Sequence, residues 1–163
     1  MKQEINETDF DIYSKAASLG AVAGLRAFAA PALLNYFATH GENSQLNSNY
    51  LSSPKISAAI NLLAAGELIG DKMPFTPNRT ELPGLIARIV SGAFVGGSIC
   101  AARRKDFWAG ATIGAVSAVA AAYAGQHIRQ KIADESGIPS AFLGAVEDAT
   151  AIGIGVNALK DGK

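Results

Sequence analysis

Eight charged residues lie inside or directly beside apolar stretches that otherwise have the composition of helices. Four are cations and four are carboxylates, so their charges balance. They are Arg26, Lys72, Arg79, Arg88, Glu67, Asp71, Glu147 and Asp148. A charge at membrane depth costs about 2.5–3.5 kcal/mol on insertion scales, so it needs a partner or a wet cavity. Carboxylates can carry protons or bind cations through hard oxygen ligands. These residues therefore predict an ion site, a proton site or a pathway for a small solute.

The densest part of this group is the stretch 66–80. Glu67 and Asp71 are four residues apart and so share one face of a helix. Lys72 follows directly, and Pro74 and Pro77 prevent a continuous helix after it. Broken helices at membrane depth often line substrate sites, so this stretch is predicted to contribute to the site.

A second interpretation of the same charges needs no ligand. They could form an internal salt-bridge network that fixes the register of the helices and carries nothing. The first hypothesis gives a small transporter or channel-like protein, and the second gives a structural or assembly protein of the membrane. A solvated cavity around the carboxylates would favour the first, and a dry core of ion pairs would favour the second.

Catalysis has the least support in the sequence. An intramembrane enzyme that acts on lipid phosphate could use clustered carboxylates to hold a metal, but the sequence has no recognisable nucleophile arrangement. His40 and His127 lack metal-ligand spacing with each other and with Cys100, the single cysteine. No glycine-rich phosphate loop with the required Lys-Ser/Thr is present. The sequence therefore predicts no enzyme activity, no metal site and no cofactor.

Five apolar segments must position these charges, and they cover residues 16–38, 56–70, 85–102, 107–125 and 141–159. Alternating patterns typical of strands are absent, so the sequence predicts an all-α transmembrane bundle of about five helices. Residues 1–14 form a polar lead, residues 15–160 the membrane domain and residues 161–163 a tail. The first segment has 23 residues, more than the roughly 20 that span a bilayer. The second has only 15, so it or the fifth could be broken or re-entrant.

The charges are distributed unevenly over these segments. Segment 107–125 carries none, and it is expected to end at Gly125, where a polar and basic run begins. We therefore expect the other four helices to supply charge to a shared polar centre, with 107–125 as an uncharged packing partner. Glu147 and Asp148 are adjacent, so their side chains are expected to point to different faces.

Composition favours a membrane over water. Charged residues make up 17% of the chain, against about 25% in soluble domains, and the zero net charge offers nucleic acid no attractive field.

Glycines recur four residues apart at Gly20/Gly24, Gly66/Gly70, Gly92/Gly96 and Gly110/Gly114. In water each costs about 1 kcal/mol against alanine, whereas in lipid the pair opens a groove for a neighbouring helix. The alternative is a soluble alanine-rich bundle with 107–125 at its centre. The pattern predicts a multi-pass protein of the inner membrane, and its glycine faces could also join copies into a homo-oligomer.

The basic residues do not decide the orientation of such a bundle. If five helices alternate across the bilayer, six Lys and Arg residues fall on each side. The cluster of Arg103, Arg104 and Lys105 weakly favours its own side as cytoplasmic, because cytoplasmic loops carry an excess of Lys and Arg.

Several short motifs resemble those of one membrane-protein family. They are Gly24-Leu25-Arg26 with Ala30-Pro31, Ala65-Gly66-Glu67-Leu68-Ile69-Gly70-Asp71-Lys72-Met73-Pro74, Thr76-Pro77-Asn78-Arg79-Thr80, Gly84, Ala87-Arg88-Ile89-Val90-Ser91-Gly92-Ala93, Glu147-Asp148-Ala149 and Ile152-Gly153. Together, over roughly residues 16–158, they resemble the bacterial integral membrane family catalogued as domain of unknown function 4126. The Glu-x-x-x-Asp-Lys-x-Pro block that begins at Glu67 is its most specific part. The resemblance implies a small multi-pass membrane protein without an established activity. It supports the choice of charged residues and supplies no mechanism.

Overall fold

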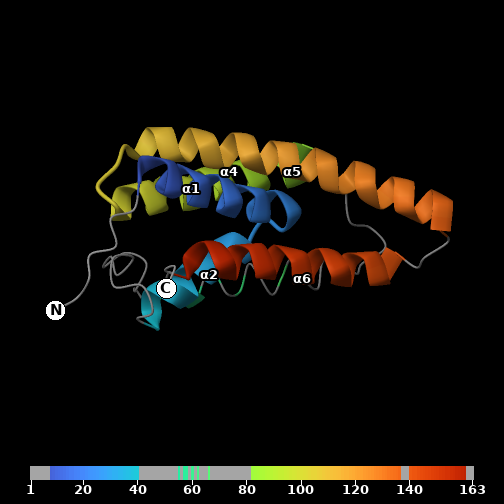
Figure 1. The fold of residues 1–163 in the computed structure, drawn as a ribbon. Helices are drawn as coiled ribbons and strands as arrows, with labels where there is room; N and C mark the ends of the chain where they lie inside the picture. Colours follow the sequence, from blue (N-terminus) through green and yellow to red (C-terminus); the bar gives the residue numbers. More distant parts are fainter. Residues whose placement is uncertain are drawn as a thin grey trace.

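The chain is helical over most of the residues that its structure describes. The computed structural model describes residues 8–40, 82–136 and 140–160, together with six isolated positions between 55 and 66. The helices in these ranges are α1 Asp9–Leu25, α2 Ala29–Thr39, α4 Leu82–Ala102, α5 Phe107–Ser136 and α6 Ser140–Leu159 (Figure 1). The described residues contain no strand, so the predicted all-α fold is confirmed. Three of these helices, α4, α5 and α6, contain stretches long and apolar enough to cross a membrane.

The first apolar segment is not the single helix that its sequence predicts. α1 ends at Leu25, and Arg26 adopts an extended backbone with φ −140° and ψ 113°. α2 then begins at Ala29, whose amide donates to the carbonyl of Arg26 over 3.3 Å. Pro31 lies in the first turn of α2, where a missing N–H costs no helical hydrogen bond. One predicted span is therefore two shorter helices joined at Arg26.

The helix predicted for residues 107–125 is longer than expected, because α5 continues past Gly125 to Ser136. Its 30 residues correspond to about 45 Å at 1.5 Å per residue, against about 30 Å of hydrocarbon in a bilayer. Polarity alone does not stop a helix, and the stronger stop signals, Gly137 and Pro139, come only after Ser136. The extension adds Arg129 to a helix that was expected to carry no charge.

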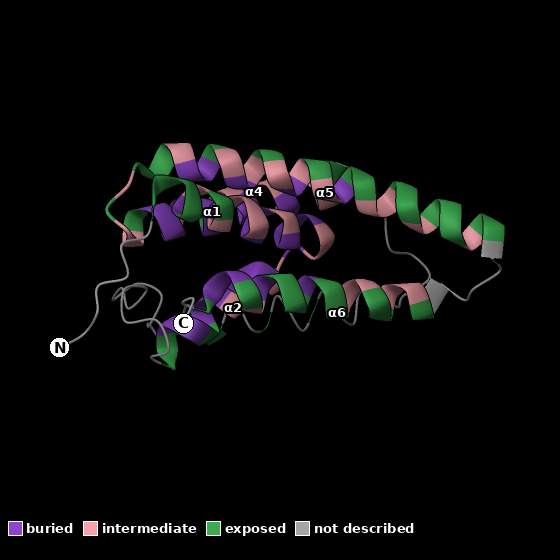
Figure 2. Cartoon of the chain, viewed as in Figure 1, coloured by how far each residue is buried: buried purple, intermediate pink, exposed green. Residues whose placement is uncertain are grey.

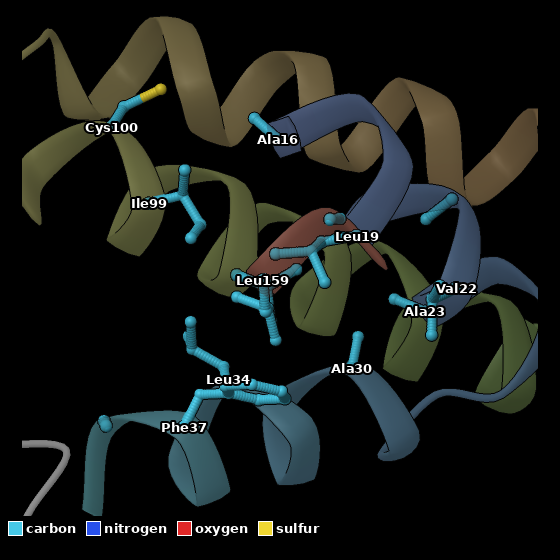
Figure 3. Close-up of a cluster of buried hydrophobic side chains, with 14 of the residues drawn as sticks. Ala16, Leu19, Val22, Ala23, Ala30, Leu34, Phe37, Ile99, Cys100 and Leu159 are labelled. Atoms are coloured by element: carbon cyan, nitrogen blue, oxygen red, sulfur yellow. The ribbon is translucent and has the colours of Figure 1, made fainter. Parts of the chain in front are cut away.

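The helices form two layers. α1, α4 and α5 pack together in one layer, and α2 and α6 lie side by side in the other (Figure 1). The two layers meet over a core that includes Leu19, Leu34 and Leu159, all fully buried (Figure 3). The second half of α5 and the first half of α6 extend beyond this core and are largely exposed or half-buried (Figure 2).

Three of the four predicted glycine pairs lie at helix contacts. α1, α4 and α5 approach one another through Gly20, Gly24, Gly92, Gly96, Gly110 and Gly114. A Cβ on Gly20 would lie 2.7 Å from the Cα of Gly114, so the helices touch backbone to backbone. Close approach of this kind is typical of membrane helices. Of the remaining pair, Gly70 lies outside the described residues, and a Cβ on Gly66 would meet nothing within 4 Å.

The two faces of α4 reverse the arrangement found in a soluble helix. Its exposed face carries large apolar side chains four residues apart, at Leu82, Ile86, Val90 and Phe94. Its buried face carries Arg88 and Ser91, each only 5% exposed. A helix at a water surface would turn its polar residues outward. The outer face of α4 is therefore suited to lipid.

Charged groups fix the start of α1. The amide of Asp11 donates to Thr8 Oγ1 over 3.3 Å, and the amide of Thr8 donates to Asp11 Oδ2 over 3.0 Å. Hydrogen bonds from Thr8 hold the pKa of Asp11 below its ordinary value. Lys105, in the turn between α4 and α5, pairs with Asp9 at 2.5 Å, and this hydrogen bond raises the pKa of Lys105. The beginning of α1 is thus joined to the α4–α5 turn.

We expect the first turn of α1 to fray in acid. A carboxyl with a lowered pKa stabilises the fold fully above its unfolded value, about 3.9, and this contribution is lost as the pH falls through the lower folded value. The protection factor of the Ile12 amide, which donates to the carbonyl of Thr8 over 3.2 Å, should therefore fall below about pH 4. In the Asp11→Asn variant it should be lower at neutral pH and change little with acid. A variant with the same acid dependence as the wild type would contradict the assignment.

Candidate functional site

The break between α1 and α2 is joined to α6 by an ion pair. Arg26 donates through Nε to one carboxylate oxygen of Asp148 and through its second terminal nitrogen to the other, at 2.9 Å. The two side chains are 11% and 27% exposed, respectively. A two-point contact of this kind between guanidinium and carboxylate is stronger and more directional than a single charged hydrogen bond. Arg26 therefore fixes α6 to the point where the first apolar segment is broken.

α4 satisfies the backbone that the break leaves open. Helix ends leave carbonyls without intrahelical partners. Arg88 donates through Nε to the carbonyl of Gly24 over 3.0 Å and through a terminal nitrogen to that of Gly84, also over 3.0 Å. The hydroxyl of Ser91 donates to the carbonyl of Ala27. A cation at the C-terminus of a helix is also favoured by the helix dipole. Arg88 thus stabilises the end of α1 as well as carrying a buried charge.

A second ion pair lies beside the first and links α5 to α6. Arg129 approaches Glu147 with 3.9 Å between a terminal nitrogen and Oε2, and the two side chains are 31% and 13% exposed. Glycines make room for the pair: a Cβ on Gly125 would lie 3.2 Å from Glu147 Oε1, and a Cβ on Gly144 would lie 4.0 Å from Arg129. Glu147 therefore lies against α5, whereas Asp148 reaches the break. The prediction that these neighbours point to different faces is confirmed.

Two contributors to this region were missed by the sequence analysis. α5 was expected to be an uncharged packing partner, and that expectation is wrong because Arg129 lies on its extension. The signal was the absence of glycine and proline between Gln126 and Ser136, which favours a continuing helix. Ser91 was not singled out, and its role depends on a helix break that the sequence analysis did not predict, although Arg26 and Pro31 interrupt the apolar run at this place.

Four of the eight predicted charged residues can be placed. Arg26 and Asp148 contact each other, Arg88 holds the carbonyl of Gly24 two residues before Arg26, and Glu147 pairs with Arg129. The others lie outside the described residues. They are Glu67, Asp71, Lys72 and Arg79. Within the described ranges no three His, Cys, Asp or Glu side chains are grouped to hold a metal ion. The described part of the polar centre thus consists of paired charges and backbone carbonyls held by side chains.

Both oxygens of the Asp148 carboxylate are engaged by Arg26. A proton or cation can therefore bind this carboxylate only in competition with the guanidinium. Since Arg26 also joins α1 to α2, such competition would act directly on the break.

Comparison with known proteins gives a family and no activity. Searches of the curated proteins and of the solved structures found no match to this chain. The model of one family, described as a domain of unknown function, DUF4126, matches residues 14–160. This range includes all five described helices apart from the first turn and a half of α1. The chain therefore belongs to the DUF4126 family.

Proposed function

We propose that the protein is a multi-pass protein of the bacterial inner membrane, a small transporter or channel-like protein with an ion site centred on Arg26 and Asp148. The observation that carries the proposal is the helix break, where an ion pair and two side-chain-bound carbonyls meet among apolar helices. Interrupted helices with paired charges at membrane depth are a common construction of ion and substrate sites in transporters. The apolar outer face of α4 supports the membrane location.

The proposed step is exchange of Arg26 for a proton or a cation at Asp148. Binding of either to the carboxylate removes the attraction that holds the guanidinium. The extended backbone of Arg26 is then released from α6, and α2 can move relative to α1. Meanwhile Arg88 and Ser91 keep the carbonyls of the break satisfied, so the movement does not expose bare backbone to lipid.

The remaining predicted residues keep their place in this proposal. Glu67 and Asp71 would add carboxylates to the pathway, and Lys72 and Arg79 would balance them. Glu147 offers a second titratable group one residue from Asp148, and its partner Arg129 lies on a part of α5 that is only half-buried. The pathway would thus lead from the break toward the exposed halves of α5 and α6.

Flux measurements on reconstituted protein test this function. We expect wild-type proteoliposomes to show proton or cation flux and the Asp148→Asn variant to lose it by at least tenfold, because the neutral amide has no negative charge to attract a cation and cannot take up and release a proton. The matched control is Asp134→Asn, the same chemical change at an exposed position on the α5 extension. Wild-type vesicles that behave like empty ones for protons, monovalent and divalent cations and common anions would refute a transport function.

A structural role is the second candidate, and the two-point contact of Arg26 with Asp148 favours it. In this role the pair only fixes α6 against the break. The Arg26→Met/Asp148→Leu double variant would then fold as well as the wild type, and any flux through the wild type would persist in it. Loss of flux in a well-folded double variant would favour transport instead.

A further inference from the structure

We propose that α1 and α2 form a re-entrant hairpin that enters the bilayer from the cytoplasm and returns to the cytoplasm without crossing. The inference rests on the membrane location proposed above, but not on any transport activity. It follows from the depth of the break, the direction of α2 and the distribution of basic residues.

The break lies between the ends of the helices that can span. Gly24, at the end of α1, packs against Ala118, which follows Phe107 by 11 residues or about 17 Å of α5. The carbonyl of Gly24 is also bound by Arg88, which follows Leu82 by six residues or about 9 Å of α4. α4 and α5 run in opposite directions, so these two distances are measured from opposite ends of the bundle. The break therefore lies between the two membrane surfaces that these helices define and reaches neither of them.

α2 then returns toward the end from which α1 came. On α6, Asp148 pairs with Arg26, and seven residues later Gly155 lies against Leu33 of α2 and close to Val22 of α1. From Asp148 to Gly155, the neighbouring residues at the end of α1 decrease in residue number from Arg26 to Val22, whereas those on α2 increase to Leu33. α1 and α2 therefore run in opposite directions beside α6. Figure 3 shows the same reversal, with α1 running from Ala16 to Val22 and α2 running back from Ala30 to Phe37. Thr39 and Asp9 thus face the same end of the bundle.

The α4–α5 turn and the end of α6 belong to this same end. The ion pair between Asp9 and Lys105 joins the start of α1 to the α4–α5 turn. Leu159 packs with Leu34 in the core, so α6 also finishes on this side (Figure 3). Trp108, 75% exposed next to the turn, is placed as an interfacial aromatic anchor.

Basic residues are concentrated at this shared end. Apart from Arg26 and Arg88 at the break and Lys55, which lies outside the five helices, the described Lys and Arg residues divide unequally between the two ends. Five lie near the shared end, namely Lys15, Arg103, Arg104, Lys105 and Lys160, and two lie at the α5–α6 end, namely Arg129 and Lys131. Cytoplasmic segments carry the excess of Lys and Arg. The sequence analysis found equal numbers of Lys and Arg residues on the two sides of the bilayer, but it assumed that the first segment crosses the bilayer. With a hairpin in its place, the shared end is assigned to the cytoplasm.

Thiol labelling of single-cysteine variants tests the hairpin directly. Cys100 is buried and is first replaced by alanine. Four exposed positions then receive one cysteine each: Phe10→Cys and His40→Cys flank the hairpin, Lys160→Cys marks the shared end, and Glu135→Cys marks the opposite end. A membrane-impermeant maleimide is added to intact spheroplasts and, separately, to permeabilised ones. We expect only Glu135→Cys to react in intact spheroplasts and all four to react after permeabilisation.

Three other outcomes would contradict the hairpin, its orientation or the membrane location, respectively. Opposite accessibility of the Phe10→Cys and His40→Cys variants would show that the segment crosses the membrane, and the hairpin would be wrong. Labelling of Phe10→Cys, His40→Cys and Lys160→Cys from outside, with Glu135→Cys protected, would keep the hairpin and reverse the orientation. Recovery of the protein in the soluble fraction after alkaline extraction would overturn the membrane location itself. None of these results depends on ion flux, so a failure of the transport hypothesis remains distinguishable.

Discussion

Replacing Gly114 by valine is expected to lower the free energy of unfolding by about 3 kcal/mol or more, because overpacking between rigid elements cannot relax through a side chain. A Cβ at Gly114 would lie 2.9 Å from the carbonyl carbon of Gly92 and 3.2 Å from the Cα of Gly96. α1 approaches the same glycine through Gly20. The substitution would therefore force α5 away from α4, at a point where α1 also contacts α5. Denaturant titration of purified protein in detergent micelles measures the loss.

The matched control for this experiment is Gly153→Val on α6. A Cβ there would meet nothing within 4 Å, so the same change of residue type is made without a clash. Both positions lie inside helices, so the change in intrinsic helix propensity largely cancels between them. We expect a change of no more than about 0.5 kcal/mol in the control. Equal losses in both variants would show that close packing at Gly114 does not hold the layer together.

The second large effect is expected at the ion pair of the break. Removing one member of a buried pair leaves an uncompensated charge and typically costs about 3–5 kcal/mol, whereas replacing both members by apolar residues is often neutral. Because Asp148 keeps 27% of its side-chain surface exposed, we expect about 3 kcal/mol for either Arg26→Met or Asp148→Leu alone. The double variant should recover most of this loss. A double-mutant cycle in detergent gives the coupling energy, which is the sum of the two single losses minus the loss in the double variant and is therefore expected to exceed the loss in either single variant.

Arg129 and Glu147 provide the comparison for that cycle. Their closest atoms are 3.9 Å apart and Arg129 is 31% exposed, so water screens the pair more strongly. The corresponding cycle, with Arg129→Met and Glu147→Leu, should give a coupling energy below about 1 kcal/mol. If both cycles gave the same coupling, the two-point geometry at Arg26 would have no special importance for the fold.

Composition and glycine spacing were sufficient to predict the helical fold and that the glycine faces of α1, α4 and α5 lie against neighbouring helices. Both signals are local: an apolar run without strand alternation predicts a helix, and glycines four residues apart predict a close neighbour. They could not predict the break at Arg26. Ala16 to Ala38 is apolar enough for one helix, and the alternative depends on Arg88, Ser91 and Asp148, which are distant in sequence.

The charged residues of the site were found by a simple physical rule, but their pairing was not. An arginine or carboxylate in an apolar run needs a partner, so Arg26, Arg88, Glu147 and Asp148 stood out from the sequence alone. Which cation meets which carboxylate depends on helix direction and register, and these follow from tertiary contacts. Arg129 was overlooked for the opposite reason, since it lies in a polar run where a charge needs no explanation.

The long sequence separation of the contacts at the break also bears on how the protein is made. Arg88 lies 64 residues after the carbonyl of Gly24 that it binds, and Asp148 lies 122 residues after Arg26. At a synthesis rate of about 5–20 residues per second, Asp148 is synthesised roughly 6–24 s after Arg26. The first two helices are thus produced early but can reach their final arrangement only after the last helix has been synthesised. The break between α1 and α2 is therefore expected to be among the last parts of the fold to form, although it lies near the beginning of the chain.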